Sequence, residues 1–132
     1  MRRRASSYQR GEVVVVPFPF ADLSAQKVRP SVVVSGSEYH RDEPDVIVAC
    51  VTSNVTQNAG STDTLLDDWK KAGLHVPSVV KSALSTLEPS LIRYRVGKLT
   101  ARDMSAVAER IARALELALT SHEETAAIQI KT

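Results

Sequence analysis

The chain has 132 residues, of which 43% are hydrophobic and 24% are charged, and its net charge is +2. These values fit one globular domain and exclude a disordered chain, while so small a charge does not by itself identify a nucleic-acid binder. The single cysteine, Cys50, excludes an internal disulfide, and no apolar stretch approaches the ~20 residues that a membrane-spanning helix needs. We therefore expect a soluble cytoplasmic protein with no membrane partner.

The two ends of the chain differ in composition from the middle. Four arginines lie within residues 1–10, and such a basic arm either contacts phosphates or merely increases solubility. Residues 120–132 alternate weakly in polarity and either add an edge strand or stay disordered. We expect a flexible arm over residues 1–10, a single domain over residues 11–119 and a tail over residues 120–132.

Valine-rich runs predict β-strands along most of the chain, because β-branched residues favour a packed, pleated surface. The expected strands are Val13–Phe18, Ser31–Ser35, Val46–Val51, Thr62–Leu66, Val79–Leu87 and Leu91–Val96. Pro17, Pro19 and Pro30 are expected at strand ends, since proline cannot donate to a ladder. The last two strands are expected to pair across a tight turn at Glu88–Ser90, and Asp68–Gly73 reads as a short helical turn. Short strands separated by turns predict an antiparallel barrel or sandwich.

One long helix is expected over Ala101–Leu119, with Thr100 as its N-cap and Asp103 in the capping-box position. Apolar residues recur along it at helical spacing and form one stripe. These residues are Met104, Val107, Ala108, Ile111, Leu115 and Leu119. The stripe would cover either the sheet or another subunit, and we expect it to cover the sheet.

No metal or cofactor site is expected from the sequence. His40, His75 and His122 are scattered, and no pair has the spacing that places two ligands on one helix face. Arg29 and Thr52, in contrast, lie at comparable ends of two apolar strands. If those strands are antiparallel neighbours, a guanidinium and a hydroxyl meet at one rim, where they suit a phosphate group.

Several segments resemble the MazF/PemK-like toxins, the ribonuclease halves of bacterial type II toxin–antitoxin pairs. The segments are GEVVVVPFPF from Gly11, KVRPSVVVS from Lys27, VACVTSN from Val48, PSVVK from Pro77 and VGKLT from Val96. The resemblance implies a mainly β fold, a small SH3-like antiparallel barrel with a C-terminal helix, and a homodimer that binds a cognate antitoxin. It also implies metal-independent, sequence-specific cleavage of single-stranded RNA, with Arg29 and Thr52 as the catalytic pair.

Further residues are expected to bind the RNA. The candidates are Phe18, Lys27, Ser53, Asn54 and Lys81. Phe18 and Phe20 form either a base-stacking platform or a plug of the core, and the loops Pro19–Lys27 and Thr52–Ser61 would select the substrate. Many members of the toxin family carry an Asp-Gln pair after the PSVVK stretch, whereas this chain has Lys81–Leu84 there, so Lys81 would contribute charge instead.

Two other functions remain open from the sequence. One is a protein-binding inhibitor of the gyrase-poisoning type on the same fold, against which the mid-chain position of the sole tryptophan, Trp69, argues. The other is a catalytically silent, RNA-binding member of the family. No general base is assigned from the sequence.

Overall fold

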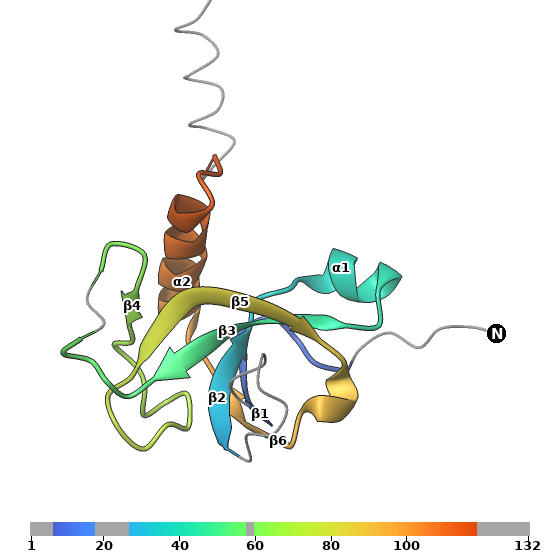
Figure 1. The fold of residues 1–132 in the computed structure, drawn as a ribbon, viewed down its shortest axis with the longest axis horizontal. Helices are drawn as coiled ribbons and strands as arrows, with labels where there is room; N and C mark the ends of the chain where they lie inside the picture. The colour runs from blue at the N-terminus through green and yellow to red at the C-terminus, as the bar shows by residue number, and fades with distance from the viewer. Residues whose placement is uncertain (1–6, 18–26, 58–59, 119–132) are drawn as a thin grey trace, which may run out of the picture.

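The computed structural model describes residues 7–17, 27–57 and 60–118. Six strands form one antiparallel sheet in the order β4-β5-β3-β2-β1-β6, which curls around its own axis (Figure 1). The strands are β1 (Glu12–Pro17), β2 (Val28–Val33), β3 (Val46–Thr52), β4 (Thr64–Leu65), β5 (Val79–Leu87) and β6 (Tyr94–Lys98). The helices are α1 (Ser37–Asp42), the 3-10 turn η1 (Pro89–Leu91) and α2 (Ala101–Ala114). The predicted mainly β fold with a C-terminal helix is confirmed.

β1 is buried on both faces, which explains its unbroken valine run. Successive side chains of a strand point to opposite faces. Val13, Val32 and Ala49 lie side by side on three strands and pack, on one face, with Met104 and Val107 of α2. Val14, Val16, Val33 and Val48 pack on the other face with Leu87 and Ile92, inside the curl. We call these face A and face B.

The predicted pairing of the last two strands is wrong. β5 pairs with β3 and β4, whereas β6 pairs with β1 at the far end of the strand order. The tight turn at η1 is present, but it crosses between two distant strands because the sheet curls (Figure 1). The predicted tight turn is therefore confirmed, whereas the predicted pairing of the two strands that flank it is wrong.

Several strand boundaries also differ from the expected ones. β2 begins at Val28, so that Arg29 and Pro30 lie within the strand and Pro30 pairs with Val15 of β1. Pairing between β2 and β3 starts only at Ser31, so at Pro30 the strand is flanked on one side, where a missing N–H is tolerated. β4 is reduced to two residues, and β6 starts at Tyr94 instead of Leu91.

The long helix begins as expected and ends early. The Thr100 side chain accepts a hydrogen bond from the Asp103 N–H and caps α2, and Met104 and Val107 pack against the sheet, as expected. The helix stops at Ala114, five residues before the predicted end, and Glu116 adopts a φ of 56°. Leu115, assigned to the buried stripe, is instead 53% exposed. The last residue of the predicted helix, Leu119, lies outside the described residues, as do most of the predicted arm and all of the predicted tail.

Candidate functional site

Arg29 and Thr52 lie at the same end of two neighbouring strands. The antiparallel ladder between β2 and β3 pairs Ser31 with Cys50, and Val33 with Val48. Continuing this register by two residues sets Arg29 across from Thr52, and residues opposite each other in such a ladder point to the same face. Since Arg29 also pairs with Val16 of β1, this is face B. The neighbouring strands that the sequence argument required are therefore present.

The Thr52 hydroxyl is held by its own loop. Its Oγ1 accepts a hydrogen bond from the backbone N–H of Asn54 at 3.1 Å. The side-chain amide of Asn54 donates to Gln57 Oε1 at 2.8 Å. Because a hydroxyl also carries one donor proton, Thr52 can still donate to an incoming oxygen. Ser53 and Asn54 follow it on the exposed surface, so residues 52–57 form a small polar turn beside Arg29.

Two further predicted contacts, Lys27 and Lys81, differ in their surroundings. Lys27 is exposed and directly precedes β2. Lys81, on β5, forms an ion pair of 2.9 Å with Asp63, whose side chain is 7% exposed. Burial opposes the ionisation of Asp63, but the hydrogen bonds from Lys81 and the Gly60 N–H and the nearby cations outweigh it and lower its pKa. The charge of Lys81 is thus largely compensated inside the protein.

The buried thiol of Cys50 lies close to this group of cations. Burial raises the pKa of Cys50, while the positive charges of Arg29 and Lys81 act in the opposite direction. Both cations therefore surround the same stretch of β3. Phe18, the remaining predicted contact, lies outside the described residues, as does Phe20.

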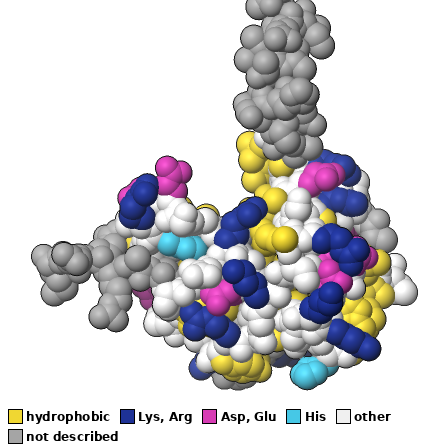
Figure 2. Space-filling model, turned by 180° about the vertical axis from the view of Figure 1, so that it is seen from behind, with side chains coloured by type: hydrophobic (Ala, Val, Ile, Leu, Met, Phe, Trp, Pro, Cys, Tyr) yellow, Lys and Arg dark blue, Asp and Glu magenta, His cyan; other side chains and the backbone are white. Residues whose placement is uncertain are grey.

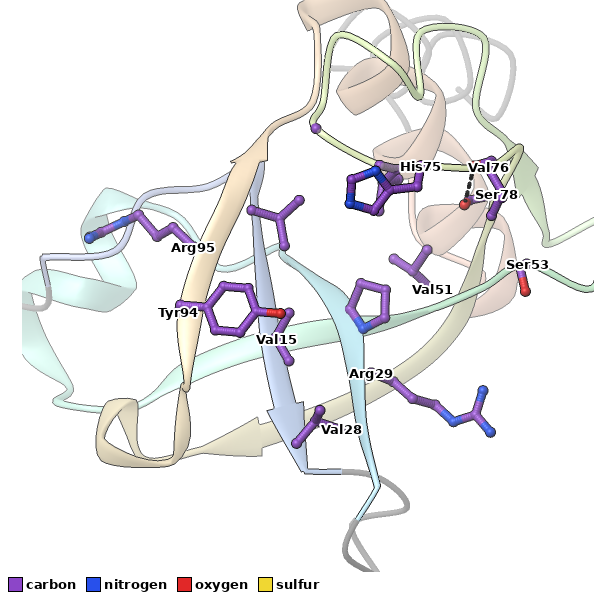
Figure 3. A pocket seen from close by; sticks show the side chains of 14 residues that line it. Val15, Val28, Arg29, Val51, Ser53, His75, Val76, Ser78, Tyr94 and Arg95 are labelled. Carbon is purple, nitrogen blue, oxygen red and sulfur yellow. Dashed lines mark hydrogen bonds between the residues drawn. The ribbon is translucent and has the colours of Figure 1, made fainter.

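A pocket of about 600 Å³ opens beside Arg29, on face A (Figure 3). Its floor follows one row across the sheet, since Tyr94 of β6 pairs with Val15 and Val15 pairs with Pro30. Segment 73–78 supplies the other wall, with His75 and Val76. Arg29 and Ser53 reach the pocket at its edge, and in Figure 3 the Arg29 side chain extends away from Tyr94. The Arg29–Thr52 pair and the pocket thus share one end of the sheet.

The sequence reasoning missed His75 and Tyr94. Tyr94 is 60% exposed although its neighbours in the pocket are mostly apolar. Tyr94 could have been found only by pairing β6 with β1, because that pairing sets Tyr94 beside Val15, which in turn pairs with Pro30. His40, the histidine nearest to the second strand in sequence, is buried in α1 at the opposite end of β2. It lies 2.6 Å from Ser35 Oγ, and burial lowers its pKa.

The chain that leads into the His75 wall is fixed to α2. The buried Asp103 carboxylate accepts the backbone N–H groups of Asp67 and Asp68 at 3.1 and 2.8 Å. Asp103 is thus used to hold this segment, a role that the predicted capping box did not include. Asp68 in turn accepts hydrogen bonds from Thr100, at 2.7 Å, and Arg102, at 2.8 Å, and these two contacts lower its pKa.

Two glycines let the same segment lie directly against β6. A Cβ on Gly97 would stand 2.2 Å from the carbonyl oxygen of Ala72. A Cβ on Gly73, which has a φ of 90°, would stand 2.5 Å from the carbonyl oxygen of Val96. Backbone therefore meets backbone, and the spacing between the His75 wall and the Tyr94 strand is set by this contact.

Other surfaces are less suited to a site. Over the described residues, no group of three histidine, cysteine or acidic side chains comes together to hold a metal ion, and no helix is long and apolar enough to cross a membrane. On the reverse side, Lys and Arg side chains alternate with Asp and Glu (Figure 2). Ion pairs such as Arg102–Asp68 and Arg113–Glu109 show that basic side chains on α2 have acidic partners.

Comparisons with known proteins agree with the fold and the motifs. Residues 9–115 match the family model of the PemK-like, MazF-like toxin of type II toxin–antitoxin systems. A comparison with curated protein sequences finds no match.

Among solved structures, the chain is similar to an endoribonuclease in complex with its cognate antitoxin from a mycobacterial species. That pair shares 20% identity over 85% of this chain and 98% of the other, with a TM-score of 0.68. The Mycobacterium tuberculosis toxin MazF-mt6 shares 24% identity over 81% and 98%, with a TM-score of 0.65. A MazE–MazF structure from Deinococcus radiodurans shares 16% identity over 86% and 100%, with a TM-score of 0.68.

At these identities the solved structures establish a common fold, while the family model spans most of the chain. The resemblance seen in the sequence motifs is confirmed. The chain belongs to the PemK-like, MazF-like toxins of type II toxin–antitoxin systems.

Proposed function

We propose that this toxin is an endoribonuclease that cleaves single-stranded RNA at a short sequence motif without a metal ion, with Arg29 and Thr52 at the scissile phosphate. The observation that supports the proposal is the register of β2 and β3, whose continuation by two residues sets Arg29 across from Thr52 at one end of the sheet. Support also comes from the similar mycobacterial proteins that are themselves endoribonucleases.

The chemistry needs little more from the protein than these two groups. The 2′-oxygen of the RNA attacks the adjacent phosphorus and loses its proton, while the bond from phosphorus to the 5′-oxygen breaks and that oxygen takes up a proton. The products are a 2′,3′-cyclic phosphate and a 5′-hydroxyl. Arg29 offers its fork of donors to the non-bridging oxygens, whose negative charge grows in the transition state. Thr52, whose Oγ1 accepts the Asn54 N–H, donates a hydrogen bond from its hydroxyl to the same phosphate.

The partners of the toxin follow from the same surface. Three of the similar structures, the mycobacterial endoribonuclease with its cognate antitoxin and two MazE–MazF structures, are complexes, and we infer that a cognate antitoxin binds this chain too. An acidic, disordered segment that covers Arg29 and Lys27 would exclude RNA and become ordered as it binds. We also expect the toxin to act as a homodimer.

The test is cleavage of a mixed-sequence single-stranded RNA in excess EDTA by the wild type and by Arg29→Ala. We expect discrete fragments that end in a 2′,3′-cyclic phosphate, a loss of at least 100-fold for Arg29→Ala, and resistance of RNA methylated at the 2′-oxygens. Arg41→Ala is the matched control, because Arg41 is an exposed arginine of α1, at the opposite end of β2. Intact RNA after incubation with folded wild-type protein would refute the proposal and favour a protein target.

A further inference from the structure

Face A of the sheet is only partly covered by the helix. Met104 and Val107 of α2 pack over Val13 and Val32, two residues along the strands from Val15 and Pro30. The row of Tyr94, Val15 and Pro30 is the floor of the 600 Å³ pocket. An apolar floor of this size next to a polar rim is typical of a ligand site.

The exposed side chains of the pocket are of a kind that favours a flat, aromatic ligand. Tyr94 is 60% exposed, Val76 is 48% exposed and Val28 is 46% exposed. Figure 3 shows the Tyr94 ring on the β6 side and the His75 ring on the facing wall. No carboxylate lines the pocket among the described residues, so nothing there repels the phosphates of a nucleic acid.

The two walls are held apart by fixed backbone. Gly73 and Gly97 place segment 73–78 against β6, and Asp103 holds Asp67 and Asp68, which precede this segment, on α2. Ser78, whose hydroxyl donates to the Val76 carbonyl at 2.9 Å, retains acceptor capacity toward the pocket. The pocket is therefore shaped before a ligand arrives.

We propose that this pocket binds one unpaired nucleobase of the RNA, stacked on Tyr94 with His75 on the opposite side, next to the phosphate at Arg29 and Thr52. The inference rests on the proposed function and adds to it the subsite that selects the substrate. Arg29 lies at the edge of this face A pocket and also belongs to the phosphate site on face B. An RNA chain that passes around this end of β2 at Arg29 would therefore present a base to one face and the scissile phosphate to the other. Proteins read single-stranded RNA by splaying bases onto aromatic side chains in this way.

The experiment combines a protein variant with a substrate variant. Tyr94→Ala and wild type are compared on an RNA oligonucleotide that carries the mapped cleavage motif, and on copies that have an abasic residue on either side of the scissile phosphate. We expect Tyr94→Ala to raise KM by about 5- to 150-fold, the range of one stacked base. The abasic residue at one of the two positions should cause a similar loss in wild type and little further loss in Tyr94→Ala. Tyr94→Phe keeps the ring and should retain the affinity.

Three results would overturn the subsite: an unchanged KM for Tyr94→Ala, losses that multiply in the combined experiment, or a Tyr94→Phe as weak as Tyr94→Ala. In each of these cases the wild type still cleaves, so the proposed function stands. Binding of a fluorescent, 2′-O-methylated copy of the oligonucleotide gives a second readout that needs no cleavage. If the wild type binds this copy and Tyr94→Ala does not, while neither cleaves RNA in EDTA, the base pocket is supported and the metal-independent nuclease is refuted.

Discussion

Substitution of Asp103 tests whether its buried carboxylate holds the chain that leads into the pocket wall. Asp103 is 1% exposed and lies in the first turn of α2, from which it accepts the N–H groups of two residues 35 and 36 positions earlier in the chain. Replacing it by alanine leaves both N–H groups of the segment without that acceptor. We expect Asp103→Ala to destabilise the fold and to loosen the wall that carries His75.

The magnitude follows from two opposing contributions. Each hydrogen bond to a charged acceptor contributes about 1.5–3 kcal/mol, so two of them contribute about 3–6 kcal/mol. Removing a buried charge also removes part of its desolvation cost, which offsets some of that loss. The free energy of unfolding should therefore fall by about 2–4 kcal/mol.

Equilibrium unfolding in urea measures this difference, with two control variants. Asp103→Asn keeps one carbonyl oxygen as acceptor and should lose less than Asp103→Ala. Glu109→Ala removes an exposed acid from the same helix, where its pair with Arg113 is worth about 0.2–0.5 kcal/mol. A loss below about 1 kcal/mol for Asp103→Ala would mean that the two bonds do not hold the segment, and the account of a fixed wall would be wrong.

Two further predictions concern the same wall. Gly97→Ala should destabilise the protein and reduce RNA cleavage, because the new Cβ would stand 2.2 Å from the Ala72 carbonyl oxygen. Gly36→Ala is the control and should be tolerated, since a Cβ there has nothing within 4 Å. Thermal unfolding and cleavage rates measure the difference, and equal effects of the two substitutions would contradict the backbone contact. The pKa of Asp68 in the folded protein lies below its usual 3.8, so its hydrogen bonds to Thr100 and Arg102 stabilise the fold above that pH and cease to do so as the pH falls through the folded pKa. Asp68→Asn should flatten this acid dependence of the free energy of unfolding, while Asp67→Asn, at a 63% exposed side chain, should leave it unchanged.

The part of the site that the sequence predicts depends on strands that can be recognised from their β-branched runs, and on the condition that two of them are antiparallel neighbours. The valine runs of β1, β2 and β3 are buried on both faces, and their antiparallel pairing brings Arg29 and Thr52 to one end of the sheet. The structure supplies the pairing that the sequence could state only as a condition.

The pocket could not be predicted because it depends on contacts between distant segments. A tight turn such as η1 has the same residue pattern whether the strands on either side of it pair with each other or, as here, lie far apart in the strand order of a curled sheet. The His75 wall has no periodic pattern, and its position follows from Asp103 and from the glycine contacts with β6. Neither kind of contact can be read from local residue pattern.

The irregular wall between Leu66 and Ser78 also affects the thermodynamics of substrate binding. Ordering a flexible segment costs about 1–2 kcal/mol per residue in backbone entropy. Here the Leu66 N–H donates to the Ser78 carbonyl at 3.0 Å, and the Asp103 and glycine contacts hold the residues between them, so folding has already met this cost. A ligand that enters the pocket therefore loses little affinity to loop ordering, and discrimination between ligands depends on how well each fits a cavity of fixed shape.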